Sequence, residues 1–377
     1  MTELAKDYNS KKYNNIKLGI GIGKAAASFL LLLYFVVSGY SLYLERFLSL
    51  YIENGYLLFT AFTIILGVIS ASIFFPINFY AEYLLEHQYN LSNQTFGGWL
   101  WEGFKGLLVG GVIGIPLLLV FFWSLNTFLE NWWLPFAIIV FVVSVILARI
   151  VPLVIMPLFY KITPIEDEDL KERIINLSEK VGMKVENVFT FNMSKNTKKA
   201  NAAFTGLGKT KRILLGDTLL ENFTNDEIET VIAHELGHYK HKHIVKNIAI
   251  GTFFSFITFY LIATLYSVSL DWFGFITITQ IAAFPLLSLW GIIIGLVQSP
   301  VSNIISRKFE YEADEYAISS TGKTEAFIKT LEKLTDQNLG DKEPHPFVEW
   351  FFYSHPSIKK RTAQIESLKS SRSQVSG

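Results

Sequence analysis

The sequence contains no cysteine among its 377 residues. Disulfide bonds, iron–sulfur clusters, thiol catalysis and cysteine-bound zinc are therefore excluded, and any metal must be held by histidine or carboxylate side chains. Charge is also scarce: 18% of the residues are charged, against about 25% in soluble domains. The 33 basic and 33 acidic residues cancel, so the chain lacks the basic excess that nucleic-acid binding requires, and we expect no nucleic-acid partner.

Long stretches of the chain carry no charge at all. Five segments lack Asp, Glu, Lys and Arg, and a sixth contains only Arg149. A membrane-spanning helix needs about 20 predominantly apolar residues, and each segment is long enough. Six buried helices of a soluble protein would need a far larger surrounding core, so the pattern predicts a multi-pass membrane protein. The charge-free segments are 25–44, 56–81, 106–129, 247–270 and 272–306, and the sixth segment is 131–160.

The distribution of charge divides the chain into four regions. Residues 161–246 contain 14 basic and 13 acidic residues, which predicts a folded aqueous domain between two sets of spans. We expect an N-terminal membrane region at 1–160 with four spans (about 25–44, 56–80, 106–128 and 133–158), the aqueous domain at 161–246, two further spans within 247–306, and a polar C-terminal region at 307–377.

Lysine placement predicts the orientation. Lysines are frequent before the first span, whereas the loop after that span has only Arg46 and the loop after the third span has no basic residue. Basic residues favour the cytoplasmic side of a membrane. With six spans, both termini and the aqueous domain are then cytoplasmic. The membrane is the plasma membrane if the source is prokaryotic and the endoplasmic reticulum if it is eukaryotic.

The aqueous domain contains the sequence His234-Glu235-Leu236-Gly237-His238. On a helix, residues four apart share a face, so the two imidazoles can bind one zinc ion and the glutamate between them can act on a water molecule there. Thr224 followed by Glu227 is typical of a capping box at the start of such a helix. We therefore expect one zinc ion per chain.

A catalytic zinc site needs a third protein ligand. In the longer metzincin pattern, the third ligand is a histidine ten residues after the first, which would be position 244. That residue is isoleucine. Glu310 is the better candidate, because Arg307, Glu310 and Asp314 share one helix face. Asp314 could then hold a ligand imidazole and Arg307 could balance the charge. An ordinary ion-paired helix surface would also explain the charged residues at 307–314. His241 and His243 are interpreted as exposed or supporting residues at the end of the zinc-binding helix.

Together with these residues, several further motifs resemble the type I CAAX prenyl proteases, a family of integral-membrane zinc metallopeptidases. They occur in the family's order over roughly residues 75–365, and the chain is most similar to the shorter prokaryotic members. The motifs are Glu86-His87, Asn93-Gln94-Thr95, Asn201-Ala202 with Gly206, the run from Lys211 to Leu220, Phe309-Glu310 with Ala313-Asp314, and Tyr353-Ser354-His355-Pro356 with Arg361.

The resemblance implies a role for each matching residue. It implies that His234, His238 and Glu310 bind zinc and that Glu235 is the general base. It also implies that His355 and Arg361 contact the substrate or the transition state. Asn201 and Ala202 would lie on an edge strand that binds the substrate backbone.

The resemblance also implies the fold class: an α-helical multi-span membrane protein whose helix bundle encloses a water-filled chamber, with a small α/β zinc-metallopeptidase domain. Within that domain we expect a helix at 165–181, ended by Gly182, and strands at 187–192, 199–205 and 211–216. The zinc-binding helix begins at about 225, and its direct continuation into the fifth span is left open.

The sequence is compatible with three functions. The leading one is a membrane-embedded zinc endopeptidase that cuts near the C-terminus of membrane-associated substrates, with a prenylated CAAX substrate as one possibility. The alternative is a quality-control metalloprotease of broad specificity. A non-enzymatic transporter is remote, because the ionisable residues cluster in the aqueous domain rather than at mid-membrane depth. The expected partners are a peptide or protein substrate, with or without a lipid, and membrane lipids.

Overall fold

The apolar segments fold into long helices in the computed structural model, which describes residues 3–183, 185, 187–205 and 212–375. Gly206 and Lys211 of the motifs above lie outside these residues. Among the described residues, six helices are long and apolar enough to cross a membrane. They are Asp7–Val37, Gly55–Gln88, Phe96–Asn131, Trp133–Phe159, His243–Ser269 and Ile281–Thr321.

The first span differs from its predicted bounds of 25–44. The helix α1 (Glu3–Val37) includes the lysine-rich segment before the charge-free stretch and ends at Val37. Gly39 follows with a φ of 79°, a left-handed conformation that glycine adopts without strain at the end of a helix. Hydropathy could not place this end, because the first residues of α2 (Tyr40–Ser49), beyond the glycine, are also free of charge.

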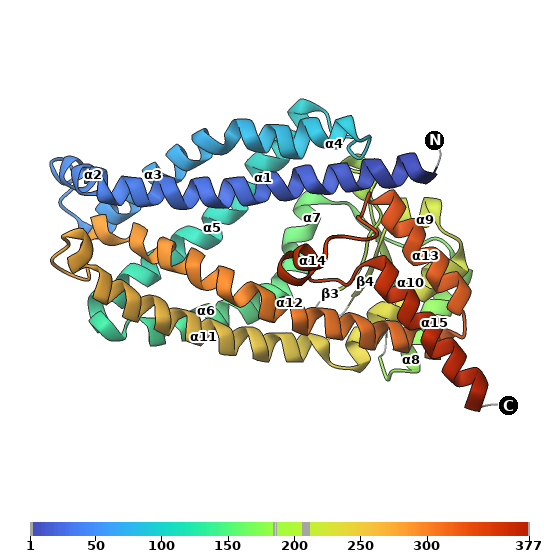
Figure 1. The fold of residues 1–377 in the computed structure, drawn as a ribbon. Coiled ribbons are helices and arrows are strands. Elements are labelled where there is room, and N and C mark those ends of the chain that lie inside the picture. The colour runs from blue at the N-terminus through green and yellow to red at the C-terminus, as the bar shows by residue number, and fades with distance from the viewer. Residues whose placement is uncertain (1–2, 184, 186, 206–211, 376–377) are drawn as a thin grey trace.

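The remaining spans run back and forth beside α1, and Figure 1 shows the N-terminal and C-terminal ends of the described chain at the same end of the molecule as the sheet. Cavities lie between the spans; one of about 740 Å³ is lined by residues of α3, α5 and α7. The elements of this region are α3 (Gly55–Asn78), the π-helix η1 (Phe79–Leu84), α4 (Leu85–Gln88), α5 (Phe96–Phe128), η2 (Leu129–Asn131), α6 (Trp133–Ile150), the π-helix η3 (Val151–Ile155) and α7 (Met156–Phe159).

The aqueous domain contains a four-stranded sheet in the order β1-β2-β4-β3. β2 and β4 are parallel, whereas the two outer strands are antiparallel to their neighbours. Three strands match the predicted segments closely, and β1 is an additional short strand that the sequence analysis did not identify. The strands are β1 (Ile162–Pro164), β2 (Val188–Phe191), β3 (Ala202–Thr205) and β4 (Arg212–Gly216).

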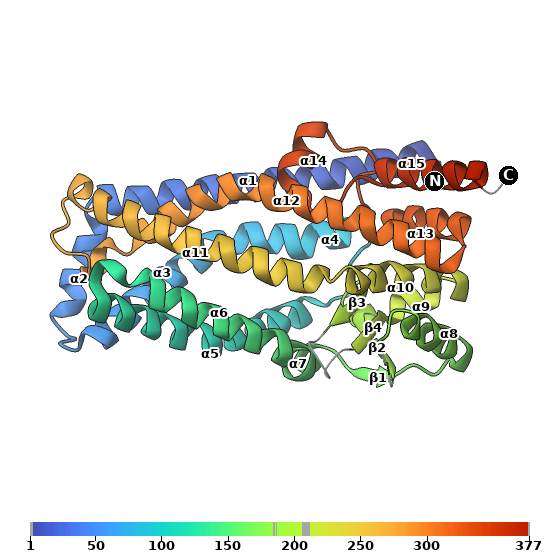
Figure 2. The same ribbon diagram turned by 90° about the horizontal axis from the view of Figure 1, so that it is seen from below.

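Helices cover the sheet and bury its apolar residues. The helix α8 (Glu168–Glu179) begins at its N-cap Asp167, whose side chain accepts a hydrogen bond from the Leu170 amide. Leu170, Ile213 and Leu236 come from α8, β4 and α10 and lie in one core. Figure 2 shows α10 beside the sheet and α11 alongside α12. The other helices here are η4 (Met193–Lys195), α9 (Asp217–Asn222), α10 (Asn225–Lys240), α13 (Thr324–Gln337) and α15 (Ile358–Val375).

Two helices connect the membrane region to this domain. α11 (His243–Ser269) is separate from α10, because Lys242 between them adopts a left-handed conformation with a φ of 57°. The zinc-binding helix therefore does not continue directly into the fifth span. α12 (Pro285–Thr321) continues through Pro300 and extends beyond the apolar segment into the aqueous domain. The remaining elements are η6 (Asp271–Phe273), η7 (Ile281–Ala283) and α14 (Pro346–Phe352).

Candidate metal centre

The helix α10 positions the two histidines. Its N-cap Thr224 accepts a hydrogen bond from the Glu227 amide, and the Glu227 side chain accepts one from the Thr224 amide, so both ends of the capping box are present. The apolar face of the helix is buried against the sheet. One helical turn separates His234 from His238, and this puts both imidazoles on the face toward α12.

α10 and α12 approach closely at Gly237. A β-carbon at this position would lie 2.8 Å from the Cα of Ala313 and 3.0 Å from its carbonyl oxygen. Real side chains do not tolerate such a contact with backbone, so only glycine fits here. The close approach brings Glu310, one turn before Ala313, opposite the two histidines.

Donor atoms of three side chains converge at this crossing. The Nε2 atoms of His234 and His238 are 3.2 Å apart. His234 Nε2 lies 3.4 Å from Glu310 Oε2, and His238 Nε2 lies 3.4 Å from the other carboxylate oxygen, Oε1. Tetrahedral bonds of about 2.0–2.1 Å would separate neighbouring ligand atoms by about 3.3 Å. The three side chains form the group of described residues that could hold one metal ion.

The surroundings of Glu310 also fit a metal. Its side chain is 6% exposed. Among the described residues, none donates a hydrogen bond of good geometry to its Oε2 atom, although His355 Nδ1 lies 3.0 Å away. A buried carboxylate oxygen without a hydrogen bond is costly. A bound cation would remove that cost, because the oxygen would then be a ligand.

Asp314 and Arg361 hold His234 from the other side. The Nδ1 atom of His234 lies 2.8 Å from Asp314 Oδ1. Arg361 donates to both oxygens of Asp314, at 2.8 and 2.5 Å. Burial opposes protonation of His234, but the hydrogen bonds to Asp314 and Glu310 outweigh it and raise the pKa of the imidazole to about 9. The predicted contact of Asp314 with a histidine of the zinc motif is therefore present in the structure.

Arg307 is placed differently from its prediction. Rather than balancing the carboxylates of the cluster, it donates hydrogen bonds to the carbonyl oxygens of Glu349 and Tyr353, at 3.0 and 2.6 Å. Within the described parts of the chain, it forms no ion pair with Glu310 or Asp314. Helix periodicity puts all three residues on one face, but it cannot show that α14 lies beside the first of them.

His238 has a partner in His243, one of the two histidines interpreted above as exposed or supporting residues. Its Nδ1 atom lies 2.9 Å from His243 Nδ1, and His243 Nε2 lies 2.9 Å from Glu312. His243 is 1% exposed and stacks on Phe309 with ring centres 4.2 Å apart. Of the two histidines expected at the helix end, His241 is exposed, whereas His243 is buried and supports His238.

A cavity of about 170 Å³ opens beside the cluster. It brings together predicted site residues from four separate parts of the chain. His355 lies at its border with a side chain that is 66% exposed. Asn201 precedes the edge strand β3, and its carbonyl oxygen accepts a hydrogen bond from Gly216. The predicted site residues that line the cavity are Asn201, Ala202, His234, Glu235, Glu310, His355 and Arg361.

Two family profiles match the chain. Peptidase family M48 matches residues 164–369, which is more than half of the chain. A profile described as the CAAX prenyl protease N-terminal region with five membrane helices matches residues 3–161. Within the described part of that range, this chain has four candidate spans.

Two curated relatives have the names of proteases. An uncharacterized metalloprotease of Bacillus subtilis is 29% identical over 361 residues, covering 95% of this chain and 84% of the relative. The CAAX prenyl protease 1 of Saccharomyces cerevisiae is 31% identical over 320 residues, covering 80% of this chain and 70% of the relative.

A solved structure shows the same architecture. The crystal structure of Ste24p from S. mikatae superposes with a TM-score of 0.85 at 27% identity, covering 97% of this chain and 90% of the other. This match confirms the predicted fold class, a chamber-forming bundle of membrane helices with a small α/β metallopeptidase domain. The chain is therefore a multi-pass membrane metalloprotease and belongs to peptidase family M48, in its CAAX prenyl protease branch.

Proposed function

We propose that this chain is a zinc endopeptidase that hydrolyses peptide bonds near the C-terminus of membrane-associated, prenylated CAAX substrates. The observation that carries the proposal is the convergence of two imidazoles and one carboxylate 3.2–3.4 Å apart, with Glu235 on the same helix as the two histidines. The names of the yeast relative and of the N-terminal profile support the substrate class.

Zinc fits this donor set better than the common hard cations. Calcium and magnesium prefer oxygen ligands, whereas two imidazoles and one carboxylate are typical of catalytic zinc. We propose His234, His238 and Glu310 as the ligands of one zinc ion. Three protein ligands leave a further position open, as a catalytic site requires.

The chain's own residues supply the proton transfers. When bound, zinc polarises the scissile carbonyl and increases the acidity of water. The Glu235 carboxylate accepts a proton from the attacking water and delivers it to the leaving amine. Through Asp314, Arg361 fixes the orientation of His234.

His355 and the sheet edge complete the proposed site. The exposed side chain of His355 donates a hydrogen bond to the oxygen that becomes negatively charged, and loss of such a donor costs about 10²–10³ in rate. β3 is an edge strand of the sheet. Asn201 and Ala202 lie at its start, where an extended substrate can add a further strand by main-chain hydrogen bonds.

We further propose that the metal site faces the cytoplasm, at the plasma membrane of a prokaryote or the endoplasmic reticulum of a eukaryote. The lysines in the first part of α1 favour this side. The two ends of the described chain lie at the end of the molecule that carries the sheet, as six spans require. Protease protection of an epitope at either terminus in sealed vesicles tests the orientation.

The proposed activity is tested with the purified protein in lipid nanodiscs. A farnesylated C-terminal CAAX peptide and the same peptide without its lipid are incubated with the native chain and with Glu235→Gln. We expect the native chain to cleave the farnesylated peptide and Glu235→Gln to retain zinc without cleaving. Cleavage by Glu235→Gln at the native rate would refute the assigned role of Glu235.

The same experiment separates the two protease functions. Preference for the farnesylated peptide supports the CAAX substrate class. Equal cleavage of both peptides would instead support the quality-control protease, which shares every catalytic residue. No cleavage by a zinc-loaded protein would remove the CAAX peptide as the substrate.

A further inference from the structure

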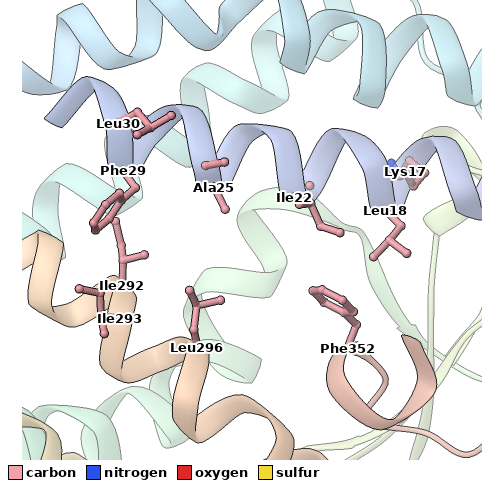
Figure 3. Close-up of a pocket in the computed structure, with 12 residues that line it drawn as sticks. Lys17, Leu18, Ile22, Ala25, Phe29, Leu30, Ile292, Ile293, Leu296 and Phe352 are labelled. Carbon is pink, nitrogen blue, oxygen red and sulfur yellow. The ribbon is translucent and has the colours of Figure 1, made fainter. Parts of the chain in front are cut away.

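An apolar groove of about 690 Å³ lies between α1 and α12. Side chains of α1 point across it toward α12, and Phe352 at the end of α14 points toward Leu18 of α1 (Figure 3). Gly21 and Ala25 contribute little side-chain volume on the α1 side, which leaves the space open. The groove lies within two candidate membrane spans, so hydrocarbon is the surrounding medium.

The lining of the groove offers almost no polar contact. Lys17 is its one charged residue among the described lining residues. The Lys17 ammonium donates to Glu86 at 3.0 Å and to the Ala81 carbonyl at 3.2 Å. Because these partners already bind it, a polar ligand in the groove would lose its hydrogen bonds to water without replacement. The chemistry of the lining therefore selects a hydrocarbon chain.

One end of the groove is held in place by hydrogen bonds from α12 to α14. Asn303 donates to the Phe351 carbonyl at 2.6 Å, and Arg307 donates to the Glu349 and Tyr353 carbonyls. These bonds fix Phe352 against the groove. They also give Arg307 a function that differs from the predicted charge balance at the metal site.

The same end leads to the metal centre. Phe352 is three residues before His355, so their Cα atoms are at most about 11 Å apart. His355 Nδ1 lies 3.0 Å from the proposed ligand Glu310. A hydrocarbon chain that ends at Phe352 is therefore close to the position of a peptide bond under attack.

We propose that the groove between α1 and α12 binds the isoprenoid chain of a prenylated substrate while the scissile bond lies at the metal centre. This inference rests on the proposed function. In a CAAX substrate the lipid is attached to the cysteine of a four-residue C-terminal motif. Any bond cut within that motif is within three residues of the lipid, which matches the short separation between the groove and the site.

The test narrows the groove and uses a matched control. Gly21 lines the groove, and a β-carbon there meets no atom within 4 Å, so Gly21→Leu adds an isobutyl group to open space. Gly23 has equally open surroundings but is about 200° round the helix and does not line the groove. Gly23→Leu therefore makes the same substitution in the same helix away from it.

Values of kcat/KM are measured in nanodiscs for a farnesylated CAAX peptide and for its unlipidated counterpart. We expect Gly21→Leu to reduce kcat/KM for the farnesylated peptide by about tenfold or more, with the unlipidated peptide unchanged and Gly23→Leu like the native chain. A native value for Gly21→Leu on the farnesylated peptide would overturn the inference. So would an equal loss on both peptides, which indicates a structural or phospholipid site.

A second measurement does not depend on turnover. A CAAX peptide with a diazirine-bearing isoprenoid is photocrosslinked to Glu235→Gln, and the labelled residues are mapped by mass spectrometry. Labels on α1 and α12 within the groove support the inference, and labels confined to other helices overturn it. If the native chain cleaves neither peptide, the proposed function fails, and this map still decides whether the groove binds the chain.

Discussion

At the residue scale, the proposed metal centre consists of its three proposed ligands and of the side chains that hold those ligands in place. His234 is held by Asp314 and Arg361, and His238 by His243. A neutral imidazole that presents Nε2 to a metal carries its hydrogen on Nδ1. With zinc bound, His238 Nδ1–H would therefore donate to His243 Nδ1, and His243 Nε2–H would donate to Glu312. Such partners orient the ligand ring and increase its basicity.

We predict that His243→Ala lowers zinc affinity by about 10–100-fold. The substitution removes the acceptor for His238 Nδ1–H and leaves the ring free to rotate. The zinc dissociation constant, measured by competition with a chelator, checks this result. The exposed neighbour supplies the control, because His241→Ala should bind zinc as the native chain does.

A purely structural effect of His243→Ala is distinguishable from the predicted one. His243→Asn offers an amide oxygen as acceptor and should recover part of the affinity. Equal zinc affinity in His243→Ala and the native chain would show that the hydrogen bond to His238 does not position this ligand.

At the element scale, the crossing of α10 and α12 builds the site. Neither helix carries all three proposed ligands, and Gly237 sets how closely the two helices can pack. The start of α10 is fixed separately by the capping box of Thr224 and Glu227. These two features can be tested independently, because they lie at different ends of the helix.

Gly237→Ala should destabilise the protein by about 1–3 kcal/mol, because the added methyl group contacts the backbone of Ala313. The helices must separate, so zinc content should fall as well. Thermal unfolding and metal analysis measure the two effects. Gly251→Ala is the matched control, since its β-carbon meets no atom within 4 Å; unchanged stability in both variants would contradict the tight crossing.

Glu227→Gln should lower the melting temperature at neutral pH. Burial opposes ionisation of Glu227, but hydrogen bonding to the Thr224 amide and the nearby Lys333 ammonium outweigh it and lower the pKa of this carboxyl below 4.5. A carboxyl whose pKa is lower in the folded protein than in the unfolded chain stabilises the fold when the pH is above the unfolded-state pKa. This stabilisation is lost as the pH falls through the folded-state pKa. Glutamine can still accept the hydrogen bond from the Thr224 amide, so the substitution removes only the charge and should cost about 0.3–1 kcal/mol.

The pH dependence is the informative part of that measurement. The melting temperatures of Glu227→Gln and the native chain should converge in acid, where the native carboxyl is protonated. Glu325→Gln removes a carboxylate with an 88% exposed side chain and should have little effect at any pH. A difference for Glu227→Gln that persists unchanged in acid would argue against the ionised capping box.

At the scale of the whole molecule, a bound metal would join parts of the chain that are distant in sequence. His234 on α10 and Glu310 on α12 are separated by the fifth span and the first part of α12. Binding to the folded chain alone raises its stability, by about 2.7 kcal/mol when free metal is 100 times the dissociation constant. The junction between the aqueous domain and the membrane helices should therefore respond to metal.

Metal removal should lower the melting temperature, and added zinc should restore it. The comparison uses native protein before and after chelation, with unfolding followed in detergent. Glu310→Ala should show no chelator-dependent shift, because it lacks the ligand from α12. A shift as large as that of the native chain would mean that the metal does not connect the two helices through Glu310.

The sequence by itself determined the classes of element and chemistry. Charge-free segments predicted six spans, since the membrane core excludes unpaired charge. The spacing of His234 and His238 predicted that they share one helix face, and the spacing of Arg307, Glu310 and Asp314 predicted that these share a face of another helix. Both predictions hold because helix periodicity depends only on neighbouring residues in the sequence. The alternation of charged and apolar segments likewise located the aqueous domain.

Only the tertiary structure decided which faces meet. It ended the first span at Val37 rather than at residue 44, directed Arg307 to the backbone of α14, and buried His243 against His238. It also formed the groove between α1 and α12. None of these contacts follows from local periodicity, because each depends on how closely helices from distant parts of the chain pack, and that is set by side-chain volume and space in three dimensions.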